Sequence, residues 1–210
     1  EHLHVRQALV AHLRHIDEDL AKRVADGLAL EALPSAPPAA APVQDLAPSP
    51  ALQIIGKMKN TLVGRVVGIL VADGSDRAAI NAVQKAVADA GARTKIVAPK
   101  VGGAKLADGT ILVADGQLAG TPSVMFDAIA VILSSEGATL LAKESAAIGF
   151  VQDAFVHLKA IAIDQGGLAL LQKANIESDG GVIKINDMAG FIAAATTRQW
   201  EREPSVRTLA

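Results

Sequence analysis

The sequence predicts an α/β domain whose central sheet is parallel and covered by helices on both faces. From residue 62 onward, short continuous apolar runs recur, as expected of strands that are buried on both faces. Segments with helical spacing alternate with these runs. Aromatic residues make up only 2% of the chain, so the core must consist of Ala, Val, Ile and Leu. Together these features are typical of a doubly wound sheet.

Residues 1–30 are predicted to be helical. Acidic residues at 17–19 mark the start of a second helix, because acids are favourable at a helix N-terminus, and Gly27 marks its end. An apolar stripe at helical spacing is formed by Leu9, Leu13, Ile16, Leu20 and Val24. Such a stripe needs a partner surface, either on a neighbouring chain or on the C-terminal domain, unless the segment stays loose.

Residues 31–61 are predicted to be a linker rich in Pro and Ala that leads into the domain at 62–210. Its prolines are Pro34, Pro37, Pro38, Pro42, Pro48 and Pro50. This composition favours extended polyproline II backbone.

The elements of the domain follow in order. Its first half is predicted to contain strands at 66–71 and 94–98. Between them lies a helix that ends at Gly91 and is marked by Ile80, Val83, Val87 and Ala90. A hairpin at 106–113 follows and turns at Asp108-Gly109. Either Ser75 or Asp76 caps the helix. Its second half is predicted to contain strands at 128–133, 160–163 and 181–185, and helices at 146–157, through 170–171 and at 187–200.

The remaining large and titratable side chains are expected to be structural. Core positions are predicted for Phe126, Phe150, Phe155 and Phe191, and Trp200 is expected to anchor the last helix. His12 and His15 could share a helix face, but we expect them at the surface because a metal site needs further ligands. His157 is expected to lie at the end of a helix.

Composition excludes several classes of function. The net charge is −2, so nothing steers the chain to nucleic acid or to an anionic membrane, and no apolar segment could span a bilayer. There is no cysteine, which excludes disulfides, thiolate catalysis and cysteine-based metal sites. A reducing cytoplasm is the default location.

The ends of the predicted strands offer the candidate ligand crevice. Asp73 follows the first strand, and Asp164-Gln165 follows the strand at 160–163. Glycines lie in the same loops, at 74, 166 and 167, but they form neither Gly-x-Gly-x-x-Gly nor a P-loop. We therefore expect no nucleotide or other cofactor here.

Several pieces of the chain, in order, resemble a large-subunit haem catalase. Residues 8–28 resemble the last helices of the catalase haem domain. The segments at 64–70, 108–110, 119–123, 157–162 and 198–200 resemble the extra C-terminal domain of these enzymes. The resemblance implies a PfpI-like, flavodoxin-type fold of the class I glutamine amidotransferase-like group. It also implies a homotetrameric parent that carries haem and converts hydrogen peroxide to water and oxygen, whereas this chain has no tyrosine to ligate haem.

In the wider PfpI-like group a nucleophilic Cys lies at a sharp strand-to-helix turn, often followed by His, with an acidic partner near the end of the first strand. Here Asp164 stands at the position of the Cys and Gln165 at that of the His. Asp73 is the nearest candidate for the acid. A carboxylate lacks the nucleophilic sulfur that acyl or glyoxal chemistry needs. The resemblance therefore implies vestigial positions and no catalytic residues.

We thus expect a non-catalytic accessory domain of a large-subunit catalase that stabilises the oligomer and modulates the enzyme. Its partners would be the haem domain and further copies of the chain. A molecular chaperone that holds unfolded clients is the alternative, because an apolar stripe such as that of Leu9, Leu13 and Ile16 would offer client-binding surface. A PfpI-like hydrolase or glyoxalase is the third hypothesis, and the absence of cysteine argues against it.

Overall fold

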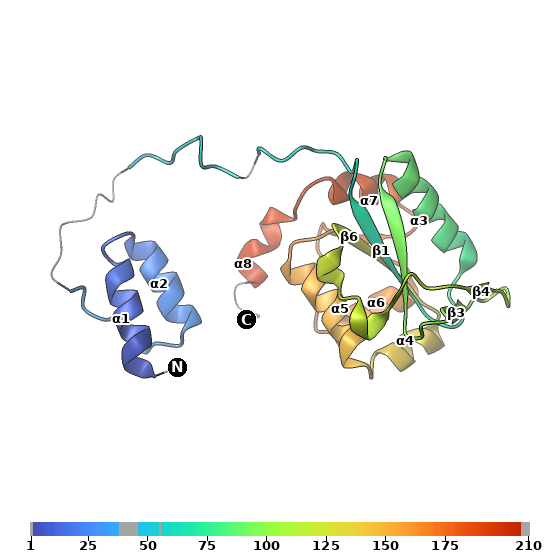
Figure 1. Ribbon diagram of the computed structural model, residues 1–210, viewed down its shortest axis with the longest axis horizontal. Coiled ribbons are helices and arrows are strands. Elements are labelled where there is room, and N and C mark those ends of the chain that lie inside the picture. Colours follow the sequence, from blue (N-terminus) through green and yellow to red (C-terminus); the bar gives the residue numbers. More distant parts are fainter. Residues whose placement is uncertain (1, 38–45, 55, 207–210) are drawn as a thin grey trace. The chain divides into compact units, whose positions relative to one another are not determined.

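A computed structural model describes residues 2–37, 46–54 and 56–206 (Figure 1). The chain divides into two compact units, one ending at Lys57 and the other beginning at Met58. The predicted boundaries after residues 30 and 61 stay predictions. Within the predicted linker, Pro38 and Pro42 lie outside the described residues.

The first unit contains a helical hairpin of α1, Leu3–Leu13, and α2, Glu18–Gly27. Asp17 caps α2, because its side chain accepts a hydrogen bond from the backbone N–H of Leu20 at 2.8 Å. The predicted second helix that begins at the acidic residues is therefore confirmed.

The predicted apolar stripe is only partly buried within this hairpin. The contact between α1 and α2 is built from Val10, Ala21 and Ala25, and Leu13 and Val24 of the stripe pack against it, whereas its other members, Leu9, Ile16 and Leu20, are exposed. Ile16 lies between the helices rather than on one of them. Because apolar side chains surround α1, the sequence does not specify which of its faces α2 covers.

The second unit is built on a six-stranded parallel sheet (Figure 1). The strands are β1 Val66–Val71, β2 Arg93–Ala98, β5 Gly116–Gln117, β6 Ala128–Ile132, β7 Ile161–Ile163 and β8 Val182–Lys184. Their order is β5-β2-β1-β6-β7-β8. Without the short edge strand β5, this is the 2-1-3-4-5 order of flavodoxin-like folds. The prediction of a doubly wound parallel sheet is confirmed.

Helices cover both faces of the sheet. One face packs against α5, Ser145–Val156, and α6, Gln165–Lys173, and includes Phe126, Phe150 and Phe155. The other face packs against α3, Arg77–Asp89, and α7, Met188–Ala195, and includes Phe191. All four phenylalanines are buried, as predicted.

Successive residues of β1 alternate between the two faces, as the two-residue period of a strand requires. Leu70 belongs to the core on the α5 and α6 side, whereas Ile69 and Val71 belong to the core on the α3 side. Asp76 caps α3 by accepting from the backbone N–H of Ala78. Ser75 is buried instead, and its hydroxyl donates to the carbonyl of Ile132 at 2.6 Å.

The remaining elements are short. The predicted hairpin is confirmed, although it begins two residues earlier, as β3 Ala104–Lys105 paired antiparallel with β4 Ile111–Leu112. Its turn contains Gly109 at φ +83°, a conformation that favours glycine. Four further short helices are η1 Leu118–Gly120, η2 Ser123–Met125, η3 Trp200–Arg202 and α8 Glu203–Val206.

Two helical predictions need correction. A helix that the sequence analysis missed, α4, spans Ser135–Leu141 and is capped by Ser134. The predicted helix at 187–200 ends at Ala195, so Trp200 lies in the following η3 rather than in that helix, and its anchoring role stays a prediction. The guanidinium of Arg65 donates to the carbonyls of Ala195 and Thr196 and so satisfies carbonyl groups at the end of α7. Among the described residues, no helix is long and apolar enough to cross a membrane.

Candidate functional site

The turn between β7 and α6 holds Asp164, the residue at the predicted nucleophile position. Both of its carboxylate oxygens are engaged. Oδ1 accepts from the backbone N–H of Gly167 at 2.7 Å, and Oδ2 accepts from that of Leu133 at 2.9 Å. The backbone of Asp164 is extended, at φ −93° and ψ −166°. A nucleophile elbow holds its nucleophile on a strained turn, so Asp164 has instead the geometry of an ordinary helix N-cap.

The two glycines that follow Asp164 let α6 approach the sheet closely. A Cβ atom at Gly166 would lie 2.1 Å from the carbonyl oxygen of Leu133, and one at Gly167 would lie 2.5 Å from that of Val131. Because both obstacles are backbone atoms of the β6 segment, no side-chain movement could make room. The sharp turn that the sequence analysis identified is therefore a packing requirement of this fold.

Burial raises the pKa of Asp164, and the backbone N–H groups of Gly167, Leu133 and Gly166 oppose that rise. The carboxylate thus lies half-buried, with its oxygens directed at backbone donors. Gln165, at the predicted histidine position, is exposed at the first residue of α6.

Asp73, the predicted acidic partner, lies just beyond the end of β1. Its Oδ1 accepts from the backbone N–H of Lys105 at 2.9 Å, and its Oδ2 lies 3.4 Å from Nζ of Lys100. These partners, with the Lys105 N–H as the largest influence, lower the pKa of Asp73. The carboxylate faces solvent, with a side-chain exposure of 56%.

Asp73 and Asp164 line different hollows at the carboxyl edge of the sheet. Asp73 lines one of about 270 Å³, and Asp164 lines another of about 360 Å³. No hydrogen bond or ion pair between described residues joins the two carboxylates. Between them, the hydroxyl of Ser134 donates to the carbonyl of Asp73 at 3.0 Å and caps α4. The arrangement does not assemble the two acids into one catalytic pair.

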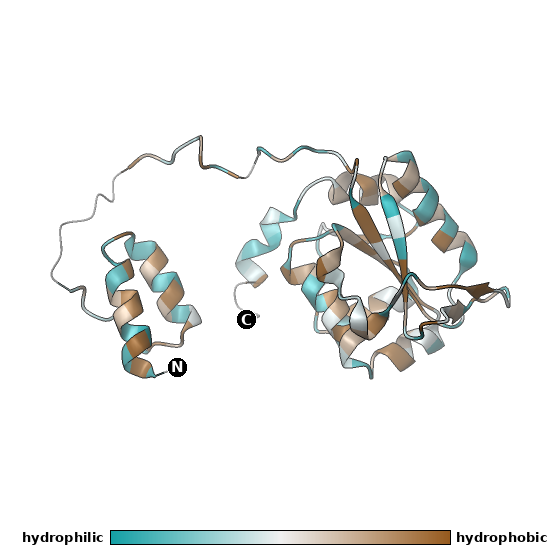
Figure 2. Cartoon of the chain, in the orientation of Figure 1, coloured by the Kyte–Doolittle hydropathy of each residue, from teal (hydrophilic) through white to brown (hydrophobic). Residues whose placement is uncertain are grey.

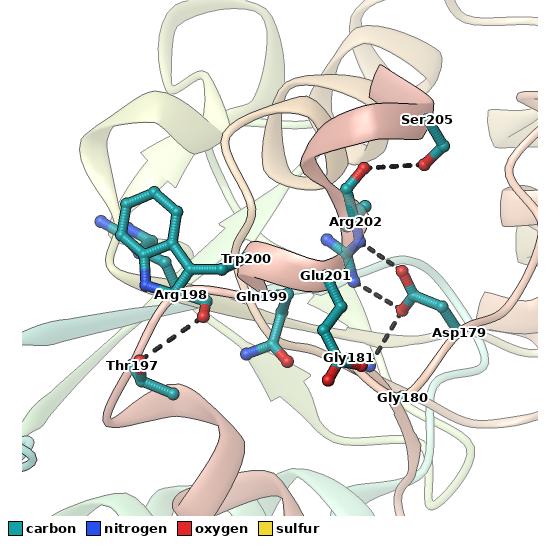
Figure 3. A pocket seen from close by; sticks show the side chains of 10 residues that line it. All are labelled: Asp179, Gly180, Gly181, Thr197, Arg198, Gln199, Trp200, Glu201, Arg202 and Ser205. Atoms are coloured by element: carbon teal, nitrogen blue, oxygen red, sulfur yellow. Dashed lines mark hydrogen bonds and ion pairs between the residues drawn. The ribbon is translucent and has the colours of Figure 1, made fainter. Parts of the chain in front are cut away.

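A larger hollow of about 670 Å³ lies elsewhere on the domain, beside η3 (Figure 3). It is lined by Asp179, Gly180, Gly181, Thr197, Arg198, Gln199, Trp200, Glu201, Arg202 and Ser205. Arg202 is 3% exposed and grips Asp179 through two nitrogens, Nε at 2.5 Å and Nη2 at 2.7 Å. Its Nη1 donates to the carbonyls of Phe155 and Lys159. Every guanidinium nitrogen of Arg202 therefore forms a hydrogen bond. Together these contacts hold the C-terminal segment against the domain, and the pair of Arg202 and Asp179 is called the Arg202 clamp below.

Sequence reasoning did not identify this clamp. The two partners lie 23 positions apart, and no local pattern links them. The only signal was the cluster at 198–200 that resembled large catalases, which lies next to Arg202. Burial raises the pKa of Asp179, but the charge and hydrogen bonds of Arg202 and the N–H of Gly181 outweigh burial and lower it.

A second buried cation, Lys159, lies where the chain enters β7. It is 3% exposed, and its Nζ donates to the carbonyl of Ser123 at 2.7 Å. Burial, and next the nearby charge of Arg198, lower the pKa of Lys159 to about 8. This contact ties η2 to the sheet. His157 is exposed and forms the C-cap of α5.

The domain shares its fold with proteins of the DJ-1/ThiJ/PfpI-like class. A structure of oxidized DJ-1 from Toxoplasma gondii matches with a TM-score of 0.53 at 14% identity, covering 69% of this chain and 97% of that one. A two-domain protein from Anabaena variabilis, which contains DJ-1/ThiJ/PfpI-like and ferritin-like domains, matches with a TM-score of 0.50 at 18% identity, covering 55% of this chain and 34% of that one. These likenesses show the fold alone.

Residues 63–203 match the family of C-terminal domains found in long catalases, and the chain belongs to this family. Catalase C of Rhizobium meliloti is 42% identical over 97% of this chain, and Catalase HPII of Mycobacterium avium is 32% identical over 92%. The chain spans only 30% and 27% of the lengths of these relatives. The resemblance to large-subunit catalases that the sequence suggested is thereby confirmed.

The residues present do not fit haem, the group that the resemblance implies for the parent enzyme. The chain contains no tyrosine, which that resemblance gives as the haem ligand. Four of its five histidines fall within the first fifteen residues, and His157 stands alone on the domain surface. In the described part of the chain, no three His, Cys, Asp or Glu residues gather as a metal site would require.

Proposed function

We propose that this chain is a non-catalytic accessory domain of a long catalase that stabilises the oligomer and modulates the enzyme. The observation that carries the non-catalytic part is the turn at Asp164. A carboxylate that caps a helix and accepts two backbone N–H groups stands where this fold class would place a nucleophile. Its oxygens are engaged, and no cysteine is available elsewhere in the chain.

The family supports the accessory role. The relatives are catalases, and this region occupies about 30% of their length, so the remaining length is available for the peroxide chemistry. The buried clamp of Arg202 and the close packing at Gly166 favour a rigid body over a labile ligand-binding module. A rigid domain can contribute stability to an assembly through contacts alone.

The experiment compares the full-length long catalase with a version that ends within the linker. We expect the truncated enzyme to retain peroxide turnover at room temperature while its oligomer dissociates at a lower temperature, as measured by light scattering and oxygen release during heating. We expect residues 1–210 alone to release no oxygen from peroxide. Loss of turnover at room temperature in a truncated enzyme that still binds haem would contradict a purely accessory role, as would oxygen release by residues 1–210.

A chaperone role is the second candidate, and one observation favours it. The α1–α2 hairpin exposes several large apolar side chains, namely Leu3, Val5, Leu9, Ile16 and Leu20. Such surfaces can bind unfolded clients. The test is suppression of heat aggregation of an unrelated enzyme by the chain and by a Leu9→Ser, Ile16→Ser variant. Suppression that the variant loses would support the chaperone role, and no suppression by either would reject it.

A further inference from the structure

The β3–β4 hairpin carries an exposed apolar face. Val101 is 78% exposed, Ile111 62% and Val113 69%, and these three residues are called the hairpin face below. Ile111 belongs to β4, and Val113 directly follows the last residue of that strand. The hairpin extends away from the sheet in Figure 1, and its β4 segment is coloured as hydrophobic in Figure 2. Single exposed apolar residues are common, but a group on one projecting element indicates an interaction site.

The opposite side of the hairpin is firmly fixed to the domain. Ala104 and Leu106 are buried, and the carbonyl of Lys105 accepts from the N–H of Gly74 at 2.8 Å. The guanidinium of Arg77 forms an ion pair with Asp108 at 2.8 Å. A partner that binds the hairpin face would therefore meet a preorganised surface and would not have to order a loop.

The hairpin also presents an unpaired strand edge. Among the described strands, β4 pairs only with β3, and its sequence is apolar. Proteins usually protect such edges with charges, proline or a covering segment, because a free apolar edge invites pairing with other chains. Neither a charge nor a proline occurs in Ile111–Val113. The two-residue length of β4 and the exposed Lys105, which pairs with Ile111, already limit pairing at this edge, so the docking surface is the apolar side-chain face rather than the strand edge.

A hollow lies beside the start of the hairpin. It has a volume of about 270 Å³ and is lined by Gly103 of the hairpin and by Leu140, which is 62% exposed on α4. Charged residues, including Lys100 and Lys143, border the same hollow. An apolar centre with a charged rim is the usual anatomy of a protein–protein interface.

The occupant follows from the size of the surface and the length of the relatives. A stable interface between separate chains uses about 20–30 residues on each side, which is far more than this hairpin offers. A small surface suffices when the partner is covalently tethered, because the effective concentration is then in the millimolar range. The relatives carry more than twice as much chain outside this region as within it.

We propose that the hairpin face docks on the remaining part of the same long catalase polypeptide, which covers Ile111 and Val113. This inference rests on the proposed function and names its contact surface. The partner of the hairpin is thus the remaining part of the same polypeptide, rather than a second copy of the hairpin or a small ligand.

The test is photo-crosslinking in the full-length enzyme with a photoreactive amino acid at Val113. The control places the same group at Lys85, whose side chain is 76% exposed on α3. We expect Val113 to crosslink to peptides outside the region of residues 1–210, with at least about tenfold higher yield than Lys85. Introducing Ile111→Lys should reduce the yield at Val113 by about tenfold, because a charge then lies in an apolar contact.

Two results would overturn the proposal. One is a crosslink that joins Val113 to another subunit, seen as a species of twice the subunit mass, and the other is a yield no higher than that at Lys85. The crosslink and the oligomer stability of the truncated enzyme are separate readouts. If Val113 crosslinks as expected but the truncated enzyme keeps its oligomer at the same temperature as the full-length enzyme, the proposed function is rejected and the contact of the hairpin face is supported.

Discussion

Arg202 and Asp179 form a paired, two-nitrogen contact in which the cation is almost completely buried and the carboxylate is one-third exposed. The guanidinium also stacks 4.0 Å above the ring of Phe155. Through these contacts η3 is held against the end of α5 and the turn before β8. Because breaking one partner of such a pair leaves a charge without its counter-charge, the pair makes the attachment of the C-terminal segment vulnerable to a single change.

We therefore expect Asp179→Asn to lower the free energy of unfolding by about 3 kcal/mol, since it leaves Arg202 buried beside a neutral partner. Trp200, the only tryptophan, lies in the same η3 and reports on this region through its fluorescence during urea unfolding. The matched control is Lys85→Ala, which removes the exposed ion pair with Asp89. Exposed pairs contribute little, so the control should change stability by less than about 0.5 kcal/mol. Equal losses of unfolding free energy in the two variants would contradict the conclusion that the pair of Arg202 and Asp179 holds the C-terminal segment in place.

Replacing each of two glycines by alanine should change the stability of the domain in opposite directions. Gly166→Ala should destabilise the domain by about 3 kcal/mol or more, because its Cβ would lie 2.1 Å from a backbone oxygen. Gly149→Ala should stabilise it by about 0.5–1 kcal/mol, since Gly149 lies inside α5 with no atom within 4 Å of the added Cβ. Urea unfolding of the two variants tests both. A tolerated Gly166→Ala would show that α6 can move off the sheet.

Much of the sheet could be predicted from the sequence because its strands are buried on both faces. The continuous apolar runs of β1 and β6 have no polar position that could be mistaken for an edge. The short α4 was missed because a helix of seven residues gives little periodicity, although Ser134 supplies a cap signal. The end of α7 could not be read locally, because Arg65, which holds its last carbonyls, lies about 130 positions earlier.

The sequence predicts where the candidate site lies in the fold, but it does not predict which groups form hydrogen bonds to its carboxylate. The sequence located Asp164 at the strand-to-helix turn, yet it could not show that Leu133, a residue of another strand segment, donates to the same carboxylate. Likewise, the clamp of Arg202 depends on a tertiary contact with Asp179. Both are long-range hydrogen bonds, which local patterns do not encode.

The two structural aspartates predict opposite responses to acid. Arg202 lowers the pKa of Asp179, so the stability that Asp179 contributes is present above its ordinary value of 3.8 and is lost as the pH falls through the lowered pKa. Burial raises the pKa of Asp164, so its contribution is largest below 3.8 and declines as the pH rises through the raised pKa.

Unfolding free energies of wild type, Asp179→Asn and Asp164→Asn, measured between about pH 3 and about pH 7, test this contrast. The advantage of wild type over Asp179→Asn should shrink toward low pH. Its advantage over Asp164→Asn should shrink toward neutral pH. If both differences followed the same trend, the environments inferred for the two carboxylates would be wrong.

Lys159 predicts a response in the alkaline range. Its pKa is lowered to about 8 in the folded protein from an ordinary value of 10.5, so between these values the unfolded chain binds more protons at this position. Stability should therefore rise with pH in that window, by up to about 1.4 kcal/mol per pH unit from this group. Lys159→Met should remove this rise, while Lys85→Met, a change at an exposed lysine, should leave it in place. Urea unfolding between pH 8 and pH 10.5 measures the slope for each variant. An unchanged slope in Lys159→Met would mean that burial does not lower the pKa of Lys159 in the folded protein.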